Sequence, residues 1–138
     1  MDVFNSTIFT TVVVSDNGFS GSLPFTMFNS SSLTTFIASK NCFVGTLSSE
    51  MCLASSLRAL ALSGLTAGSG CAISVPVLNT YETRRFDGTI PSCLFSMPNL
   101  AQLYLDGNAM DSSLYDIPES SLLQNLSLSH NMIEGSIP

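Results

Sequence analysis

Cationic residues are scarce in this chain of 138 residues, which has four Lys and Arg against ten Asp and Glu and a net charge of -6. Nucleic acids and anionic membranes are bound mainly through clustered cations, so this balance of charge disfavours both as partners. No apolar run approaches the roughly 18 residues that a transmembrane helix needs, and the first residues lack the basic segment of a signal peptide. The sequence therefore predicts no membrane span within these residues.

Motifs that hold phosphates or metals are also missing. Neither GxGxxG nor GxxxxGK occurs, so no phosphate-binding loop is expected. The four cysteines form no CxxC pair, and the gaps between them match no common zinc site. We therefore predict neither a cofactor nor a bound metal.

What the sequence does contain is a repeated pattern. Residues 100–138 fit the template LxxLxLxxNxIxGxIP once in full and once in its first half, and the template also fits three earlier stretches. The five copies begin near residues 9, 33, 57, 100 and 123, at spacings of 24, 24, 43 and 23 residues. The long spacing indicates an inserted loop at about residues 66–84. Self-similarity at such a period is typical of a solenoid.

The repeats resemble the leucine-rich repeat family, and specifically its plant-type subclass, in which an LxGxIP half follows the common LxxLxLxxN half. The resemblance covers almost the whole chain. It implies an α/β-type repeat solenoid used for binding, with a short parallel β-sheet on the concave face and a mostly irregular or 3-10 convex side. Neither end shows a polar capping repeat, so we expect residues 1–138 to be an uncapped fragment of a larger protein.

Each column of the repeat has an expected role. In the first half of a repeat, inward residues such as Leu60, Leu103 and Leu126 alternate with outward ones, which predicts a strand with one buried face. An Asn follows the strand in four copies. Its side chain can satisfy backbone groups that the turn leaves unpaired, in its own repeat and the next. The predicted structural Asn ladder consists of Asn17, Asn41, Asn108 and Asn131.

Four cysteines, Cys42, Cys52, Cys71 and Cys93, form an even set that allows two disulfides in an oxidising compartment. Four buried thiols are the alternative, because free Cys is often buried. Cys71 lies in the inserted loop and would tie that loop to the solenoid. Pairing of Cys71 with Cys93 and pairing with Cys52 both remain open at this point.

Three sequons, at Asn5, Asn29 and Asn125, are candidate N-glycosylation sites. Asn5 and Asn29 are 24 residues apart and so share a column on the outer side of the predicted solenoid. Asn125 falls on the concave face, where a glycan would obstruct binding. Together with the cysteines, the sequons favour an extracellular or cell-surface location, with a parent protein that is secreted or membrane-anchored.

The outward columns of the concave face predict a weakly charged surface with an apolar stripe, which suits a protein, peptide or glycan ligand. Tyr104 is the first candidate for a contact hot spot, because Tyr provides a large contact area at low entropy cost. The further candidate contact residues are Asp106, Gln102, Ile37, Val13, Lys40 and His130. The sequence does not predict an oligomeric state.

One set of residues on the same face invites an enzymatic interpretation. His130 is the only His, and Ser129 and Asp106 lie on neighbouring predicted strands, so a Ser-His-Asp triad is conceivable. Ser recurs in this column, however, at Ser15, Ser39 and Ser63. That recurrence indicates a column of small polar surface residues, and we predict no enzymatic activity.

The sequence leaves more than one function open. The first is a recognition module of a secreted or cell-surface protein, either a receptor-like ectodomain or an inhibitor, which binds a protein or peptide through its concave face. The alternative is a structural or adhesive cell-surface or wall protein without a discrete ligand. A third function, an intracellular scaffold, requires reduced cysteines.

Overall fold

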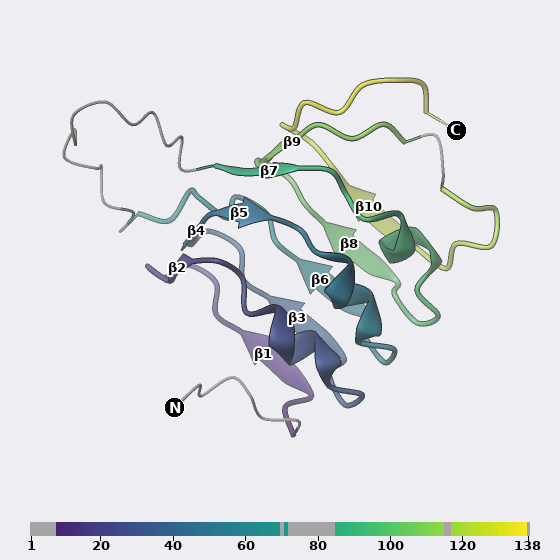
Figure 1. The fold of residues 1–138 in the computed structure, drawn as a ribbon, viewed down its shortest axis with the longest axis horizontal. Helices are drawn as coiled ribbons and strands as arrows, with labels where there is room; N and C mark the ends of the chain where they lie inside the picture. The colour runs from purple at the N-terminus through teal and green to yellow at the C-terminus, as the bar shows by residue number, and fades with distance from the viewer. Residues whose placement is uncertain (1–7, 70, 72–84, 115–116, 138) are drawn as a thin grey trace.

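The computed structural model describes residues 8–69, 71, 85–114 and 117–137, and its central feature is a parallel sheet of five strands (Figure 1). The strands are β1 (Thr11–Val13), β3 (Thr35–Ile37), β6 (Ala59–Ala61), β8 (Gln102–Tyr104) and β10 (Asn125–Ser127), in that spatial order. Each is the short segment in which inward and outward residues alternate. We call this sheet the concave sheet and its solvent-facing side the concave face.

The register of the concave sheet follows the repeat template. Val12 lies beside Phe36, Phe36 beside Leu60, Leu60 beside Leu103, and Leu103 beside Leu126. β6 pairs directly with β8 although the paired residues are 43 positions apart in the sequence. The residues between these strands therefore leave the stacking of successive repeats unbroken.

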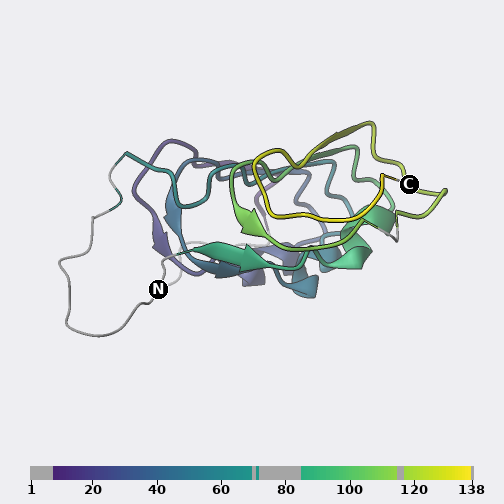
Figure 2. The same cartoon turned by 90° about the horizontal axis from the view of Figure 1, so that it is seen from above.

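The other elements return the chain to the next strand. Two smaller parallel sheets contain β2 (Ser20–Gly21) with β4 (Cys42–Phe43), and β5 (Gly45–Thr46) with β7 (Phe86–Gly88) and β9 (Ala109–Met110). The 3-10 helices η1 (Phe25–Asn29), η2 (Ser49–Leu53) and η3 (Ser92–Ser96) run side by side on the opposite side from the concave sheet (Figures 1 and 2). The predicted solenoid with a parallel sheet and a 3-10 outer side is confirmed.

The three 3-10 helices are short, and the residues at their starts are typical of helix beginnings. Pro24 and Pro91 precede η1 and η3. At η2, the side chain of Ser48 accepts a hydrogen bond from the backbone N–H of Glu50 and so caps the helix. Each 3-10 helix has five residues and ends within about two turns.

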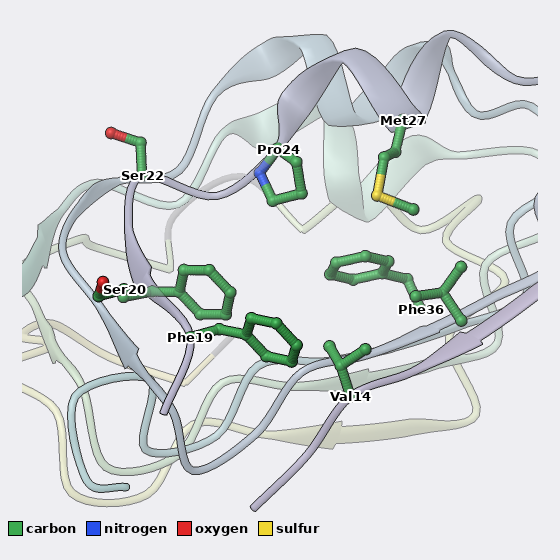
Figure 3. Close-up of a pocket in the computed structure, with 9 residues that line it drawn as sticks. Val14, Phe19, Ser20, Ser22, Pro24, Met27 and Phe36 are labelled. Carbon is green, nitrogen blue, oxygen red and sulfur yellow. The ribbon is translucent and has the colours of Figure 1, made fainter. Parts of the chain in front are cut away.

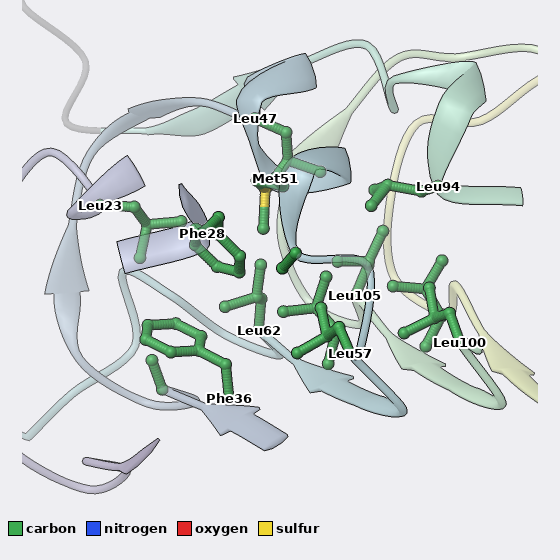
Figure 4. Packing of buried hydrophobic residues seen from close by; sticks show 14 of the residues in the cluster. Leu23, Phe28, Phe36, Leu47, Met51, Leu57, Leu62, Leu94, Leu100 and Leu105 are labelled. Atoms are coloured by element: carbon green, nitrogen blue, oxygen red, sulfur yellow. The ribbon is translucent and has the colours of Figure 1, made fainter. Parts of the chain in front are cut away.

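The hydrophobic core fills the space between the concave sheet and the 3-10 helices (Figure 4). Leu60, Leu103 and Met51 are fully buried, and the rings of Phe28 and Phe36 pack with their centroids 5.1 Å apart. The sheet supplies one wall of the core and the outer helices supply the other, so no repeat could bury its apolar residues alone.

The last concave strand differs from the central ones. Leu126 on β10 was expected in the core, but 38% of its surface is exposed, whereas Leu60 and Leu103 have none. Among the described residues, β10 pairs only with β8, so no further strand covers its outer edge. Leu126 is therefore only partly buried, because the end of the described stack leaves one side of it uncovered.

The structure pairs all four cysteines, as Cys42–Cys71 and Cys52–Cys93. Both pairings considered for Cys71 in the sequence analysis are therefore wrong. Cys52 and Cys93 lie in the equivalent helices η2 and η3 of adjacent repeats, which places them 6.1 Å apart between Cα atoms. Cys71 is instead next to the second repeat, because the backbone N–H of Gly68 donates to the carbonyl of Asn41 at 2.8 Å.

Two of the sequence-based predictions fall partly or wholly outside the described residues. These are the sequon at Asn5 and most of the loop at about residues 66–84. Within the described part of the chain, no helix is both long enough and apolar enough to span a membrane.

The stacked core predicts unequal effects of trimming equivalent Leu residues. Leu60→Ala should lower the free energy of unfolding by about 2 to 5 kcal/mol, because it opens a cavity among side chains that cannot fully relax. Leu126→Ala is the matched control and should cost clearly less, since that side chain is 38% exposed. Urea unfolding followed by circular dichroism measures both. Equal decreases in the free energy of unfolding for the two variants would contradict the deeper burial of Leu60, whose strand β6 lies between β3 and β8.

Candidate ligand-binding face

The outward residues of the concave sheet form continuous rows across it. One row, which we call the apolar row, crosses four adjacent strands and contains Val13, Ile37, Ala61 and Tyr104. The side chain of Val13 is 60% exposed, and the other three are partly exposed. The row thus presents an apolar stripe that ends in an aromatic ring, on a face that no other element of the described chain covers.

A second row, on the amino-terminal side of the apolar row, is polar. It contains Thr11, Thr35, Ala59, Gln102 and Asn125 in register. Gln102 and Asn125 are exposed. Hydrogen-bonding side chains therefore flank the apolar row on every strand except β6, where Ala59 has none.

The column that follows the strands adopts a left-handed backbone. Asp16, Lys40 and His130 have φ values of 57°, 53° and 57°, and Gly64 and Gly107 in the same column have 59° and 66°. Non-Gly residues rarely occupy this region, so the turn, and not the side chain, sets these positions. The left-handed backbone was not predicted from the sequence, although two glycines in one column were a signal of it.

The predicted contact residues Lys40 and His130 belong to this left-handed column, and both are exposed. The Lys40 Nζ atom lies 3.7 Å from the Asp16 Oδ1 atom, with both side chains more than half exposed. Exposed ion pairs of this kind contribute little to stability. The two charges nevertheless neutralise each other at the first two repeats of the concave face.

Asp106 is connected to the repeats on both sides. Its Oδ2 atom accepts a hydrogen bond from the Ser63 hydroxyl at 3.0 Å, and its Oδ1 atom accepts one from the Ser129 N–H at 3.0 Å and another from the Ser127 hydroxyl. An equivalent bond joins the Ser63 N–H to the Ser39 hydroxyl at 3.1 Å. The column that the sequence marked as small surface residues thus also cross-links neighbouring repeats.

These hydrogen bonds set the ionisation of Asp106. Partial burial opposes the charged form, but the bonds from Ser127, Ser63 and the Ser129 amide outweigh it and lower the pKa of Asp106 below its ordinary value. Asp106 is therefore an anion at neutral pH.

The arrangement does not favour a hydrolytic triad. Ser129 contacts Asp106 through its backbone N–H and not through its hydroxyl. Within the described residues, no hydrogen bond joins His130 to either of the other two. A nucleophile would need a hydroxyl bonded to the imidazole, so these three residues are better explained by the turn and the inter-repeat bonds.

The Asn ladder lies directly behind the concave face and fixes the ends of its strands. Asn41 is fully buried, and its side-chain N–H₂ donates to the carbonyls of Ala38 and Val14, both at 2.9 Å. Its Oδ1 atom accepts from the N–H of Phe19 at 3.2 Å. Asn108 and Asn131 repeat these contacts, while Asn17 bonds only within its own repeat among the described residues.

The direction of these bonds differs from the prediction. Asn41, Asn108 and Asn131 each contact their own repeat and the preceding one, not the next. The backbone of Val14, in the first repeat, is hydrogen-bonded to the second repeat: its N–H donates to the carbonyl of Ile37. The carbonyl of Val14 accepts from the side chain of Asn41, which also belongs to the second repeat. In the third repeat, Leu65 replaces Asn, and its N–H donates to Asn108 at 3.0 Å, which keeps the ladder connected.

Two of the three candidate glycosylation sites are described. Asn29 is exposed at the end of η1, on the outer side of the solenoid. Asn125 is exposed at the start of β10, on the concave face. A glycan at Asn29 would leave the apolar row free, whereas one at Asn125 would stand beside Gln102, with which Asn125 is in register.

A separate cavity of about 180 Å³ lies at the first repeat (Figure 3). Phe19, Phe36 and Met27 line it together with Val14 and Pro24. Ser20 and Ser22 also line it, and Phe19 is 42% exposed, so the cavity is a partly open hollow at the edge of the first described repeat. No residue of the apolar row lines it.

Comparison with protein families matches the Leucine Rich Repeat model to residues 122–138. Comparison with curated proteins finds no match. Comparison with solved structures finds the plant peptide hormone receptor RGFR1 in complex with RGF2, with a TM-score of 0.79 over 99% of this chain at 28% identity. The chain has the leucine-rich repeat fold.

Two receptor kinase structures from Arabidopsis also share the fold. The receptor kinase HAESA, in complex with the peptide hormone IDA and the co-receptor SERK1, matches 98% of this chain with a TM-score of 0.75 at 24% identity. The ectodomain of GASSHO1/SCHENGEN3 matches 96% with a TM-score of 0.75 at 24% identity. This leucine-rich repeat chain spans only 19%, 20% and 14% of the RGFR1, HAESA and GASSHO1/SCHENGEN3 chains.

The Asn ladder predicts a strong dependence on position. Asn41→Ala should lower the free energy of unfolding by about 3 kcal/mol, because it leaves buried carbonyl and N–H groups of two repeats unpaired. Asn17→Ala should cost about 1 kcal/mol or less, since Asn17 is exposed and bonds only to Val14 and Ser15. Urea unfolding compares the two variants. Similar decreases in the free energy of unfolding for the two variants would contradict a stabilising role for the hydrogen bonds that Asn41 makes to the preceding repeat.

The lowered pKa of Asp106 predicts a pH dependence. The stabilisation from its hydrogen bonds should be complete above the unfolded pKa of about 3.9 and should disappear as the pH falls through the lower folded value. The difference in urea midpoint between the wild type and Asp106→Asn should therefore stay constant from about pH 7 to 5 and shrink below about pH 4. A difference that stays unchanged as the pH falls further below about 4 would contradict this account.

Proposed function

We propose that this leucine-rich repeat domain is an extracellular recognition module that binds an extended peptide or protein segment on its concave face. The observation that carries the proposal is the apolar row, in which Val13, Ile37, Ala61 and Tyr104 lie in register on four adjacent strands and remain solvent-accessible. Apolar side chains aligned in this way bury area against a ligand that crosses the strands.

The dimensions of the concave sheet suit an extended peptide. Adjacent strands lie about 4.8 Å apart, so the row from Val13 to Tyr104 spans about 14 Å. An extended chain advances about 3.3 Å per residue and would place four or five residues along the row. Alternate side chains of the peptide would face the apolar row, while its backbone would lie within reach of polar neighbours such as Gln102 and Thr35.

Tyr104 is the proposed centre of the contact. It lies between two strands of the sheet and is partly exposed, so its ring has support on one side and solvent on the other. Tyr is enriched in binding hot spots because it loses little conformational entropy when it is buried. Ile37 and Val13 extend the same apolar contact toward the first repeat.

Two further findings support this function. RGFR1, which the chain matches at 28% identity, is a plant peptide hormone receptor, and its structure was solved in complex with RGF2. Two disulfides join adjacent repeats, and disulfides persist mainly in oxidising compartments. An extracellular location is therefore favoured over an intracellular scaffold, and the fold is one whose members recognise ligands without catalysing their reaction.

The test uses a displayed library of random peptides of about 12 residues, selected against the purified domain. Peptides should be enriched by the wild type, and Tyr104→Ala should weaken their binding about ten-fold or more. Leu53→Ala is the matched control, because Leu53 is a 59% exposed apolar residue on η2, away from the concave sheet. A failure to enrich peptides, or an equal loss in both variants, would contradict the proposal and favour a structural or adhesive role.

A further inference from the structure

Two Asp residues on the concave face, Asp16 and Asp106, differ in whether a cation balances their charge. Asp16 is paired with Lys40 at 3.7 Å. Asp106 instead receives hydrogen bonds from two serine hydroxyls and from the backbone N–H groups of Ser129 and of Asp106 itself, all of them neutral donors. Within the part of the chain that the structure describes, no Lys, Arg or His forms a salt bridge with Asp106. Its negative charge is therefore available to a ligand.

The neutral donors also hold the carboxylate in one orientation. Oδ1 accepts two hydrogen bonds, from Ser127 and Ser129, and Oδ2 accepts one, from Ser63. Of the two oxygens, Oδ2 accepts the single bond from the Ser63 hydroxyl, so it can accept a further hydrogen bond from an outside donor. Because the donors come from the repeats on both sides, the group is already ordered before a ligand arrives, which reduces the entropy cost of binding.

The surroundings of Asp106 leave room for a large side chain. The column of left-handed residues next to Asp106 contains two glycines: Gly64 in the turn after β6 and Gly107 in the turn after β8. These residues carry no side chain that could cover the carboxylate. On the other side, Tyr104 is the last residue of β8, and Asp106 lies two residues later in the turn that follows, about 7 Å away along the chain. An aromatic ring and an ordered anion thus border one open position.

Resting on the function proposed above, we propose that Tyr104 and Asp106 form a subsite for an arginine side chain of the peptide ligand. The guanidinium would stack on the ring of Tyr104 and donate one charge-assisted hydrogen bond to Oδ2 of Asp106. Arginine fits this position better than lysine, because its planar group both stacks on aromatic rings and donates in a fixed direction.

The position of the arginine in the peptide follows from the sheet. Ile37 is on β3 and Asp106 follows β8, with β6 between them. Two strand spacings correspond to about 10 Å, which an extended chain covers in about three residues. The subsite therefore predicts an arginine about three positions from an apolar residue that contacts Ile37.

The experiment repeats the peptide selection with the wild type, Asp106→Asn and Asp16→Asn. Asp16→Asn removes the same charge from the same face, but from a group already paired with Lys40. The wild type and Asp16→Asn should both enrich peptides with an arginine at a fixed distance from an apolar residue. Asp106→Asn should lose this arginine preference while still enriching apolar peptides. Circular dichroism establishes that each variant is folded.

A second measurement needs no change to the protein. In one enriched peptide, the arginine is replaced by citrulline, which has the same shape without the charge, or by lysine. Citrulline should weaken binding to the wild type about ten-fold or more, and lysine should weaken it less. Peptides that bind the wild type with no fixed arginine, or that tolerate citrulline, would overturn the arginine subsite while leaving peptide binding intact. A selection that enriches no peptide would overturn the proposed function itself.

Discussion

The mutual burial of inward side chains by successive repeats is the interaction on which this structure depends. Phe36, Leu60 and Leu103 stand side by side on parallel strands and are almost completely buried, whereas Leu126 on the last strand is 38% exposed. The strands have only three residues each, so none could hide its apolar side chain without a neighbour. Every other feature, including the shape of the concave face, follows from this stacking.

Hydrogen bonds at the end of each strand convert the stack into a precise surface. Asn41 ties the turn of the second repeat to the first, and Asn108 ties the fourth to the third across the position that Leu65 occupies. On the solvent side, Ser39 and Asp106 form bonds of the same kind. These bonds fix where the outward side chains lie relative to one another, and binding specificity depends on that placement.

The two disulfides join neighbouring repeats through Cys residues that are not part of the repeat template. Cys52–Cys93 joins the outer helices of the second and third repeats, whose concave strands are already paired. Cys42–Cys71 holds the segment that follows β6 against the second repeat, where Gly68 also approaches the backbone of Asn41. A Cβ on Gly68 would meet backbone atoms at 2.8 Å, so this close approach requires glycine. The tether leaves the pairing of β6 with β8 undisturbed.

The sequence by itself determined the repeat period, the inward ladder through Leu60 and Leu103, and the place of the Asn residues, because these depend on local alternation and on recurrence along the chain. It also indicated Tyr104 as an outward aromatic residue. The tertiary structure decided what depends on distances between repeats: the partners of Cys71, the backward direction of the Asn bonds, and the donors that neighbouring repeats supply to Asp106. These features involve groups about 20 to 45 residues apart, and only stacking brings such groups into contact.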